Sequence, residues 1–266
     1  MRITSQNLDQ TIVINKEIKR EIERIINVVE TRYKKVRILS SEKQALQILK
    51  EHYLIQVPIP DEDWGGAIRE LPNEIKVFVI NTAQPRVYQY FIYWHEIYHL
   101  ITGFFETTSH LISTEFDLAE RKADYFASQM LLGSDVYEYY NHLNHTLSFI
   151  EKIVHCMDMF KAPYKAILIQ LYETADEFNN KELMEQIKEN FDVKLSQNEL
   201  EGLFQKLALD VTLVQPSNII DFGILQEKID EKNKHYNNVD MYKEHEEFIK
   251  KFRKTLEELR NVRNVQ

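Results

Sequence analysis

The chain has 266 residues, of which 44% are hydrophobic and 28% charged, and its formal net charge is −9 at pH 7. This composition is ordinary for a globular protein of one or two domains, and the negative charge argues against a broad nucleic-acid-binding surface. The first ten residues are polar, no apolar run approaches about twenty residues, and Cys156 is the single cysteine. We therefore expect a cytoplasmic protein without a signal peptide, a membrane span or an internal disulfide.

Six Gly and six Pro in the whole chain favour a mainly helical architecture. The elements expected before the first motif are a loose or short extended segment over residues 1–15, a helix from Lys16 to about Tyr33 capped by Asn15, a strand over residues 36–39, a helix capped by Ser40 or Ser41 that runs through Lys50, and an extended segment over residues 54–59. A hairpin is expected next, because residues 65–69 and 75–80 flank the turn residues Leu71, Pro72 and Asn73.

Residues 86–102 contain no Gly or Pro and many aromatic and aliphatic side chains, which predicts a helix buried on several sides. Within this helix, His95, Glu96 and His99 form the pattern His-Glu-x-x-His. Side chains four residues apart lie on one helix face, so the imidazoles of His95 and His99 can converge on one zinc ion. Glu96 lies one step around the helix and is the candidate general base. The alternative is a buried helix whose histidines have other hydrogen-bond partners.

Residues 117–132 predict a second helix, in which Glu120 and Asp124 are four residues apart and project to the same side. Glu120 can complete a ligand set of two histidines and one carboxylate that leaves a position for water. Asp124 can accept the free ring N–H of a ligand histidine and so fix its tautomer. The alternative is a solvated acidic pair that complements the dipole at the start of the helix.

These two motifs together resemble the ImmA/IrrE family of bacterial and phage zinc metallopeptidases, which belong to the gluzincins. The similarity covers roughly residues 60–135. The residues that carry it are His95, Glu96 and His99, then Glu120, Ala123, Asp124, Phe126 and Ala127. Arg86 and Phe91 resemble an arginine and a phenylalanine that the family shows just before the metal helix. Tyr98 stands where the family usually has Gly, and Gly133-Ser134 stands where a Pro usually ends the second helix.

The resemblance implies a zinc endopeptidase with His95, His99 and Glu120 as metal ligands, Glu96 as the catalytic base and Asp124 behind the ligands. It also implies that the hairpin pairs with an extended substrate; a hairpin that merely covers the metal helix is the alternative. The implied substrate is a regulatory protein, often a helix-turn-helix repressor encoded nearby in a phage, mobile element or stress regulon. The competing possibility is a non-catalytic zinc-containing protein that binds and antagonises such a repressor. We expect neither direct nucleic-acid binding nor a membrane partner.

The chain after Gly133 is expected to remain helical. Expected helices cover residues 134–143, 145–160, 162–175, 180–190 and 196–209, followed by a linker over residues 216–223 and a charged helical tail. The extra histidines that could donate a hydrogen bond to a transition-state oxyanion are His110, His142, His145 and His155, and the sequence does not choose among them.

The sequence therefore predicts an α+β fold that is mostly α. A zincin-like metallopeptidase core with a small antiparallel sheet is expected over residues 1–135, a helical domain over residues 136–215, and the linker and charged tail over residues 216–266.

Overall fold

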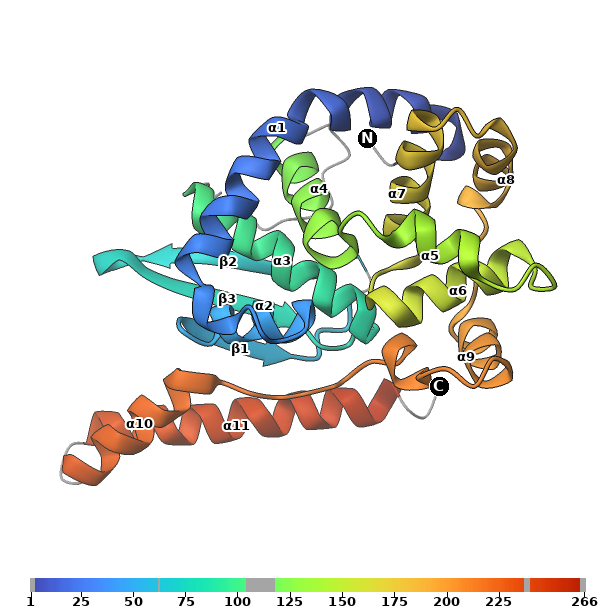
Figure 1. Ribbon diagram of the computed structural model, residues 1–266. Helices are drawn as coiled ribbons and strands as arrows, with labels where there is room; N and C mark the ends of the chain where they lie inside the picture. Colours follow the sequence, from blue (N-terminus) through green and yellow to red (C-terminus); the bar gives the residue numbers. More distant parts are fainter. Residues whose placement is uncertain (1–2, 62, 104–117, 237–239, 264–266) are drawn as a thin grey trace.

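The computed structural model describes residues 3–61, 63–103, 118–236 and 240–263 (Figure 1). This part of the chain is mostly helical with one three-stranded sheet, so the expected α+β, mostly α class is confirmed. The α-helices are α1 (Leu8–Arg32), α2 (Ser41–Leu49), α3 (Arg86–Thr102), α4 (Leu118–Leu132), α5 (Val136–His142), α6 (Phe149–Phe160), α7 (Tyr164–Glu177), α8 (Lys181–Phe191), α9 (Gln197–Lys206), α10 (Gly223–His235) and α11 (Asp240–Arg263). The strands are β1 (Tyr53–Val57), β2 (Gly66–Leu71) and β3 (Ile75–Asn81), and the short 3-10 helices are Ser5–Asn7, Lys34–Val36, Pro72–Glu74 and Val211–Val214. No described helix is both long enough and apolar enough to cross a membrane.

Helix α1 begins earlier than the sequence indicates. Residues 8–15 are helical, so the expected loose lead-in is wrong, and Asn15 is a buried residue inside the helix rather than its cap. Its side-chain amide donates to Glu173 Oε2 at 2.9 Å, 158 residues away in the sequence. The strand expected over residues 36–39 is also wrong, because this segment forms a 3-10 turn and a bend between α1 and α2.

The sheet has the strand order β1-β3-β2 and is mixed. The hairpin of β2 and β3 is antiparallel as expected, but β1 pairs with β3 in parallel, so the expectation of a purely antiparallel sheet is wrong. On the far side of β1, Gln56 N–H donates to Asp221 O at 2.7 Å, and Asp221 N–H donates back at 2.8 Å. The linker therefore caps the β1 edge. No described strand pairs with the other edge of the sheet, at β2.

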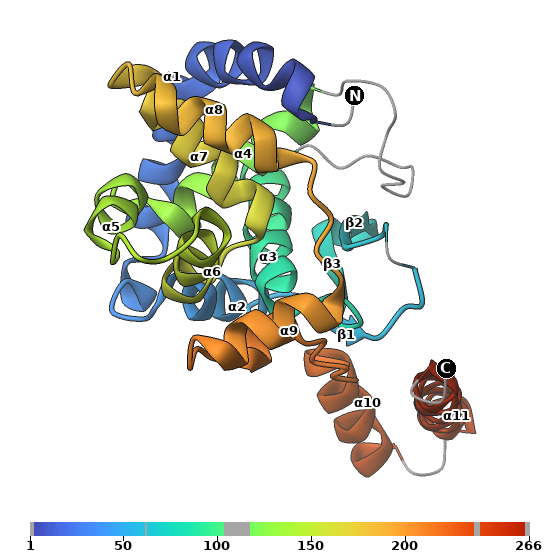
Figure 2. The ribbon, with the colours of Figure 1, turned by 90° about the vertical axis from the view of Figure 1, so that its right-hand side faces the viewer.

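The two faces of the sheet pack against different parts of the molecule. Phe78 and Leu54 face the main core, whereas Val57 and Val79 pack with Phe222 and residues of α11. This division follows from the alternation of side chains along a strand. The views in Figures 1 and 2 agree, with α3 on one side of the sheet and the pair α10 and α11 on the other.

The strand β2 approaches α3 closely at Gly65 and Gly66. A Cβ atom at Gly65 would lie 2.7 Å from Ile92 Cδ1, and one at Gly66 would lie 2.7 Å from Ile92 Cγ2. Both separations are shorter than van der Waals contact, so a side chain at either position would force Ile92 to shift. Because Ile92 lies one helical turn before His95 and Glu96, these glycines bring the open sheet edge next to the predicted motif.

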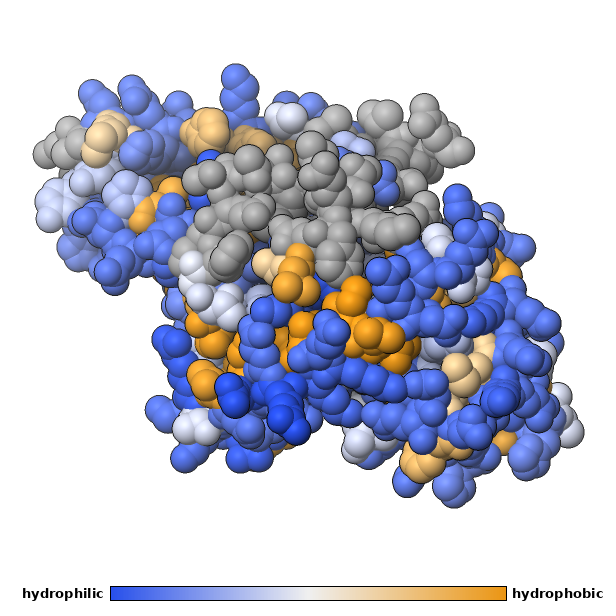
Figure 3. All heavy atoms as spheres, turned by 90° about the horizontal axis from the view of Figure 1, so that it is seen from above, coloured by the Kyte–Doolittle hydropathy of each residue, from blue (hydrophilic) through white to orange (hydrophobic). Residues whose placement is uncertain are grey.

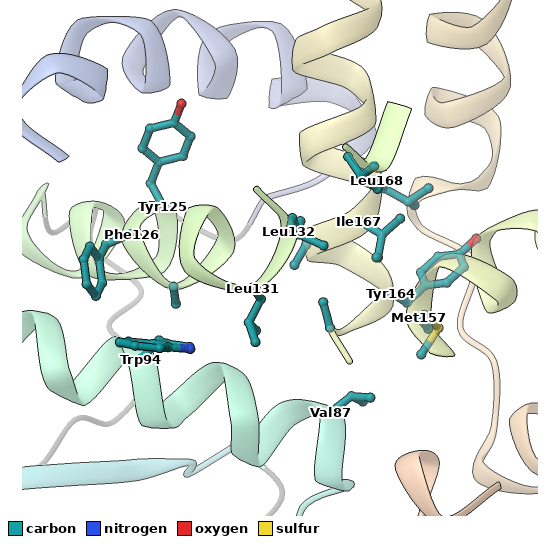
Figure 4. Close-up of a cluster of buried hydrophobic side chains, with 14 of the residues drawn as sticks. Val87, Trp94, Tyr125, Phe126, Leu131, Leu132, Met157, Tyr164, Ile167 and Leu168 are labelled. Atoms are coloured by element: carbon teal, nitrogen blue, oxygen red, sulfur yellow. The ribbon is translucent and has the colours of Figure 1, made fainter. Parts of the chain in front are cut away.

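The main core is continuous from α1 to the 3-10 helix at Val211–Val214 and therefore crosses residue 135. Its centre joins α3, α4, α6 and α7 (Figure 4). There, the Trp94 ring meets Phe126 edge-on, with 6.1 Å between ring centroids.

Viewed from above, the surface is mainly hydrophilic, with hydrophobic side chains gathered in a central band (Figure 3).

Candidate metal centre

Helix α3 has the bounds expected from the sequence, Arg86–Thr102, and ends at Gly103, which has a left-handed conformation. The apolar residues Tyr93, Trp94 and Ile97 are buried in the core, and the motif residues of the same helix are buried with them. His95, Glu96 and His99 retain only 7%, 1% and 1% of their exposure. Burying such polar groups is costly unless other groups or an ion compensate them.

Helix α4 lies against α3 and carries Glu120 in its first turn. The apolar side chains Ala123, Phe126 and Ala127 are buried, which leaves Glu120 and Asp124 on one side of the helix. Glu120 is partly exposed at 27%, and Asp124 at 42%. The two acidic residues therefore lie at the border between the core and solvent.

The structure brings His95, His99 and Glu120 together in one cluster. His95 Nε2 lies 3.1 Å from Glu120 Oε2, and His99 Nε2 lies 3.2 Å from Glu120 Oε1. The two histidine Nε2 atoms are 3.2 Å apart. One ligand atom from each residue can be chosen so that all three lie within 4.8 Å of one another, and this group could hold a metal ion.

Asp124 contacts the opposite nitrogen of His95. Its Oδ1 atom lies 3.0 Å from His95 Nδ1. When Nδ1–H donates to this carboxylate, Nε2 carries a lone pair directed at the cluster. The sequence placed Asp124 behind a ligand histidine without specifying which one, and the structure places it behind His95.

The charges around His95 are strongly negative. Burial alone would lower the pKa of His95, but the hydrogen bonds with Asp124 and Glu120 and the charges of Asp124 and Glu96 outweigh it. The pKa of His95 is therefore raised well above its ordinary value. The surroundings of this imidazole favour a positive charge.

The donor set fits a divalent metal. Two imidazole nitrogens and one carboxylate oxygen are the ligand types and number found in catalytic zinc sites that keep an open position. A cation placed among them would also offset the negative charges of Glu96 and Asp124, the same charges that raise the pKa of His95.

Tyr98 occupies the helix position between the motif residues and packs beside the cluster. Its ring is 5.6 Å from the His99 ring and 5.8 Å from the Phe126 ring, measured between centroids. Burial, followed by the charges of Glu21 and Glu120, raises the pKa of Tyr98 to about 12. Tyr98 is therefore a neutral side chain that fills space beside His99.

A buried polar network holds the other side of α4, and no sequence pattern predicts it. Glu173 of α7 accepts hydrogen bonds from Asn15 Nδ2 at 2.9 Å and from Tyr125 Oη at 2.8 Å. Arg121 donates to Asn15 Oδ1. Because Arg121 and Tyr125 directly follow Glu120 and Asp124 in the sequence, this network holds α4 against α1 and α7 while its acidic residues contact α3.

The extra histidines do not join the cluster in the described part of the chain. His110 lies outside the described residues. His142 and His145 are exposed, and His155 lies on α6. None of these three belongs to the group that could hold a metal.

Comparison of the chain with protein-family models finds no match, and no curated protein or solved structure matches it.

Proposed function

We propose that the protein is a zinc-dependent endopeptidase with a zincin-like core. The observation that supports this most strongly is the convergence of His95, His99 and Glu120, with Glu96 buried on the same helix as the histidines. This arrangement supplies a metal-binding group and a separate carboxylate, the two components of metal-assisted hydrolysis.

His95, His99 and Glu120 would hold the ion. When bound, zinc supplies a Lewis acid that lowers the pKa of water and polarises a carbonyl group. Glu96 accepts a proton from the attacking water at a carboxylate oxygen and passes it to the nitrogen of the leaving amine. Asp124 holds His95 in the tautomer whose Nε2 is free for the metal.

The open edge of β2 supports a peptide as substrate. The opposite edge of the sheet is capped at Gln56 by Asp221, and β2 lies against α3 through Gly65 and Gly66. An extended chain added to β2 would form main-chain hydrogen bonds beside the metal helix, and such pairing holds a peptide with little dependence on its sequence.

The motif resemblance favours a regulatory protein as the substrate, in particular a helix-turn-helix repressor encoded near this chain. The second candidate is a non-catalytic zinc protein that binds such a repressor. The presence of Glu96 favours the enzyme, because binding alone does not require a general base.

The test of the metal site is its metal content. Protein purified without chelators should carry about one zinc per chain, and His99→Ala should lose most of it. His155→Ala removes a histidine outside the cluster and is the matched control, which should retain its zinc. Full zinc retention in the His99→Ala protein would rule out the proposed ligand set.

The test of catalysis is Glu96→Gln, which preserves the shape of the side chain and removes the base. Zinc content and fold should persist, while cleavage of a repressor encoded next to this chain should fall by several orders of magnitude. If the parent binds the repressor but leaves it intact over hours, the binding protein is the correct alternative. If the variant cleaves as fast as the parent, Glu96 is not the base.

A further inference from the structure

The turn between α1 and α2 is a concentrated basic surface on an acidic protein. Residues 31–43 contain five Lys and Arg and one Glu, a net charge of +4 in a chain whose total is −9. The five cations are exposed, and they are Arg32, Lys34, Lys35, Arg37 and Lys43. We call these residues, together with Ile38 and Leu39, the basic turn.

Few of these cations are neutralised by the protein itself. Arg37 lies 3.7 Å from Glu30, and Arg32 lies over the Tyr33 ring. Lys34, Lys35 and Lys43 form no ion pair with any described residue. By contrast, Lys16, Lys19, Lys122 and Lys188 elsewhere on the surface each pair with a carboxylate. The basic turn is therefore available to an anionic partner.

An exposed aliphatic side chain lies among the cations of the basic turn. Ile38 is 91% exposed, and Leu39 beside it is 37% exposed. Backbone hydrogen bonds hold this turn: Val36 N–H donates to Tyr33 O at 3.1 Å, and Leu39 N–H donates to Val36 O at 2.9 Å. Tyr33 is buried and Val36 packs against the core. The exposure of Ile38 is thus a property of an anchored turn.

We propose that the basic turn docks the protein on an anionic lipid surface, with Lys34, Lys35 and Lys43 at the headgroups and Ile38 inserted between them. Clustered cations and a buried apolar group are the two contributions that together hold a protein at a membrane surface. Docking at a membrane surface does not require a helix that crosses the membrane. The negative net charge is a property of the whole chain and does not prevent a local basic surface from binding anionic lipid. The proposal therefore differs from the expectation, made from the sequence, that the protein has no membrane partner.

Other anionic partners fit the basic turn less well. Protein interfaces are depleted in Lys and enriched in aromatic residues and Arg, whereas three of the five cations here are Lys. Single-stranded nucleic acid is bound by exposed aromatic platforms, and the aromatic residue of this turn, Tyr33, is buried. The docking does not depend on the metal centre or on peptidase activity.

The experiment is co-sedimentation of the full-length protein with vesicles. Phosphatidylcholine vesicles containing phosphatidylserine should bind the protein, pure phosphatidylcholine vesicles should not, and the affinity should fall as salt is raised. Lys34→Gln with Lys35→Gln should weaken binding by about 25-fold, since each cation near an anionic membrane contributes roughly a factor of five. Ile38→Ser should weaken it by about five- to tenfold.

Matched controls change the same chemistry elsewhere. Lys181→Gln with Lys251→Gln removes two exposed lysines that form no ion pair with described residues, and Val13→Ser changes an aliphatic side chain that is 56% exposed. Both should bind vesicles like the parent, and every variant should keep the parent thermal midpoint. Lipid docking is overturned if the parent fails to bind anionic vesicles, if the controls lose as much as the test variants, or if Ile38→Ser has no effect. Tighter binding to duplex DNA than to vesicles at the same salt would also overturn it.

Discussion

Asp124 determines how His95 can act, because it occupies the ring nitrogen that faces away from the cluster. Asparagine has nearly the same shape but lacks the charge, whereas alanine lacks the hydrogen-bonding group altogether. We expect Asp124→Asn to lower zinc affinity by less than about tenfold and Asp124→Ala to lower it by roughly ten- to a hundredfold. Competitive chelator titration of the three proteins measures these differences. Equal affinities would mean that the contact with His95 has no role in metal binding.

The sequence could predict which cluster residues share a helix face, because each of the two pairs lies within one helix. His95 with His99, and Glu120 with Asp124, have a spacing of four residues that places them on one face whatever the tertiary structure. The partner of Asp124 could not be predicted in the same way. Whether His95 or His99 receives its carboxylate depends on how α3 crosses α4, and that crossing is set by packing at Trp94 and Phe126.

Helix α4 is held from two sides. Its acidic face meets α3, and its other face enters the network of Asn15, Arg121, Tyr125 and Glu173. Asn15 is fully buried, Glu173 is 2% exposed and Arg121 is 8% exposed, so these groups are shielded from water. Loss of the Glu173 carboxylate charge would remove the charged acceptor of the hydrogen bonds from Asn15 and Tyr125 and leave Asp124 as the remaining acidic neighbour of the buried Arg121 guanidinium.

Glu173→Gln should therefore lower the free energy of unfolding by about 2–3 kcal/mol, because two buried hydrogen bonds lose their charged acceptor. Tyr125→Phe removes one hydrogen bond and should cost about 1–2 kcal/mol. The control is Glu177→Gln, which removes an exposed partner of Lys19 and should cost less than about 1 kcal/mol. Urea denaturation of the four proteins provides the comparison, and similar losses for Glu173→Gln and Glu177→Gln would contradict this account.

Elements with a strong local signal were predicted well, and those defined by distant contacts were not. Residues 86–102 form the expected helix because an uninterrupted apolar run has few alternatives. The start of α1 was misplaced because Asn is common at helix caps, whereas here Glu173 of α7 satisfies Asn15 inside the helix. The parallel pairing of β1 with β3 was missed for a similar reason, since no turn between these strands specifies their relative direction.

The described residues form two hydrophobic clusters of unequal size. The larger cluster runs from α1 to the 3-10 helix at Val211–Val214 and includes the buried apolar residues of α3 and α4. The smaller cluster joins Val57 and Phe222 to Ile249 and Leu256 of α11, on the outer face of the sheet. With few buried apolar side chains to retain it, the pair α10 and α11 should open more readily than the main core.

Hydrogen exchange of the intact protein tests this difference in local stability. Amides of α11 should exchange faster than those of α3 and α4, and Leu256→Ala should accelerate exchange in α11 further. A buried leucine truncated to alanine costs about 2–5 kcal/mol, which corresponds to a rise of roughly 30-fold or more in opening. The exchange of α3 and α4 should remain at the parent rate, because their contacts lie in the other cluster. Lys251→Ala changes an exposed residue of the same helix that forms no ion pair with a described residue, and it should leave both regions unaltered. Equal acceleration of α3 and α11 in the Leu256→Ala protein would instead mean that the two clusters unfold as one cooperative unit.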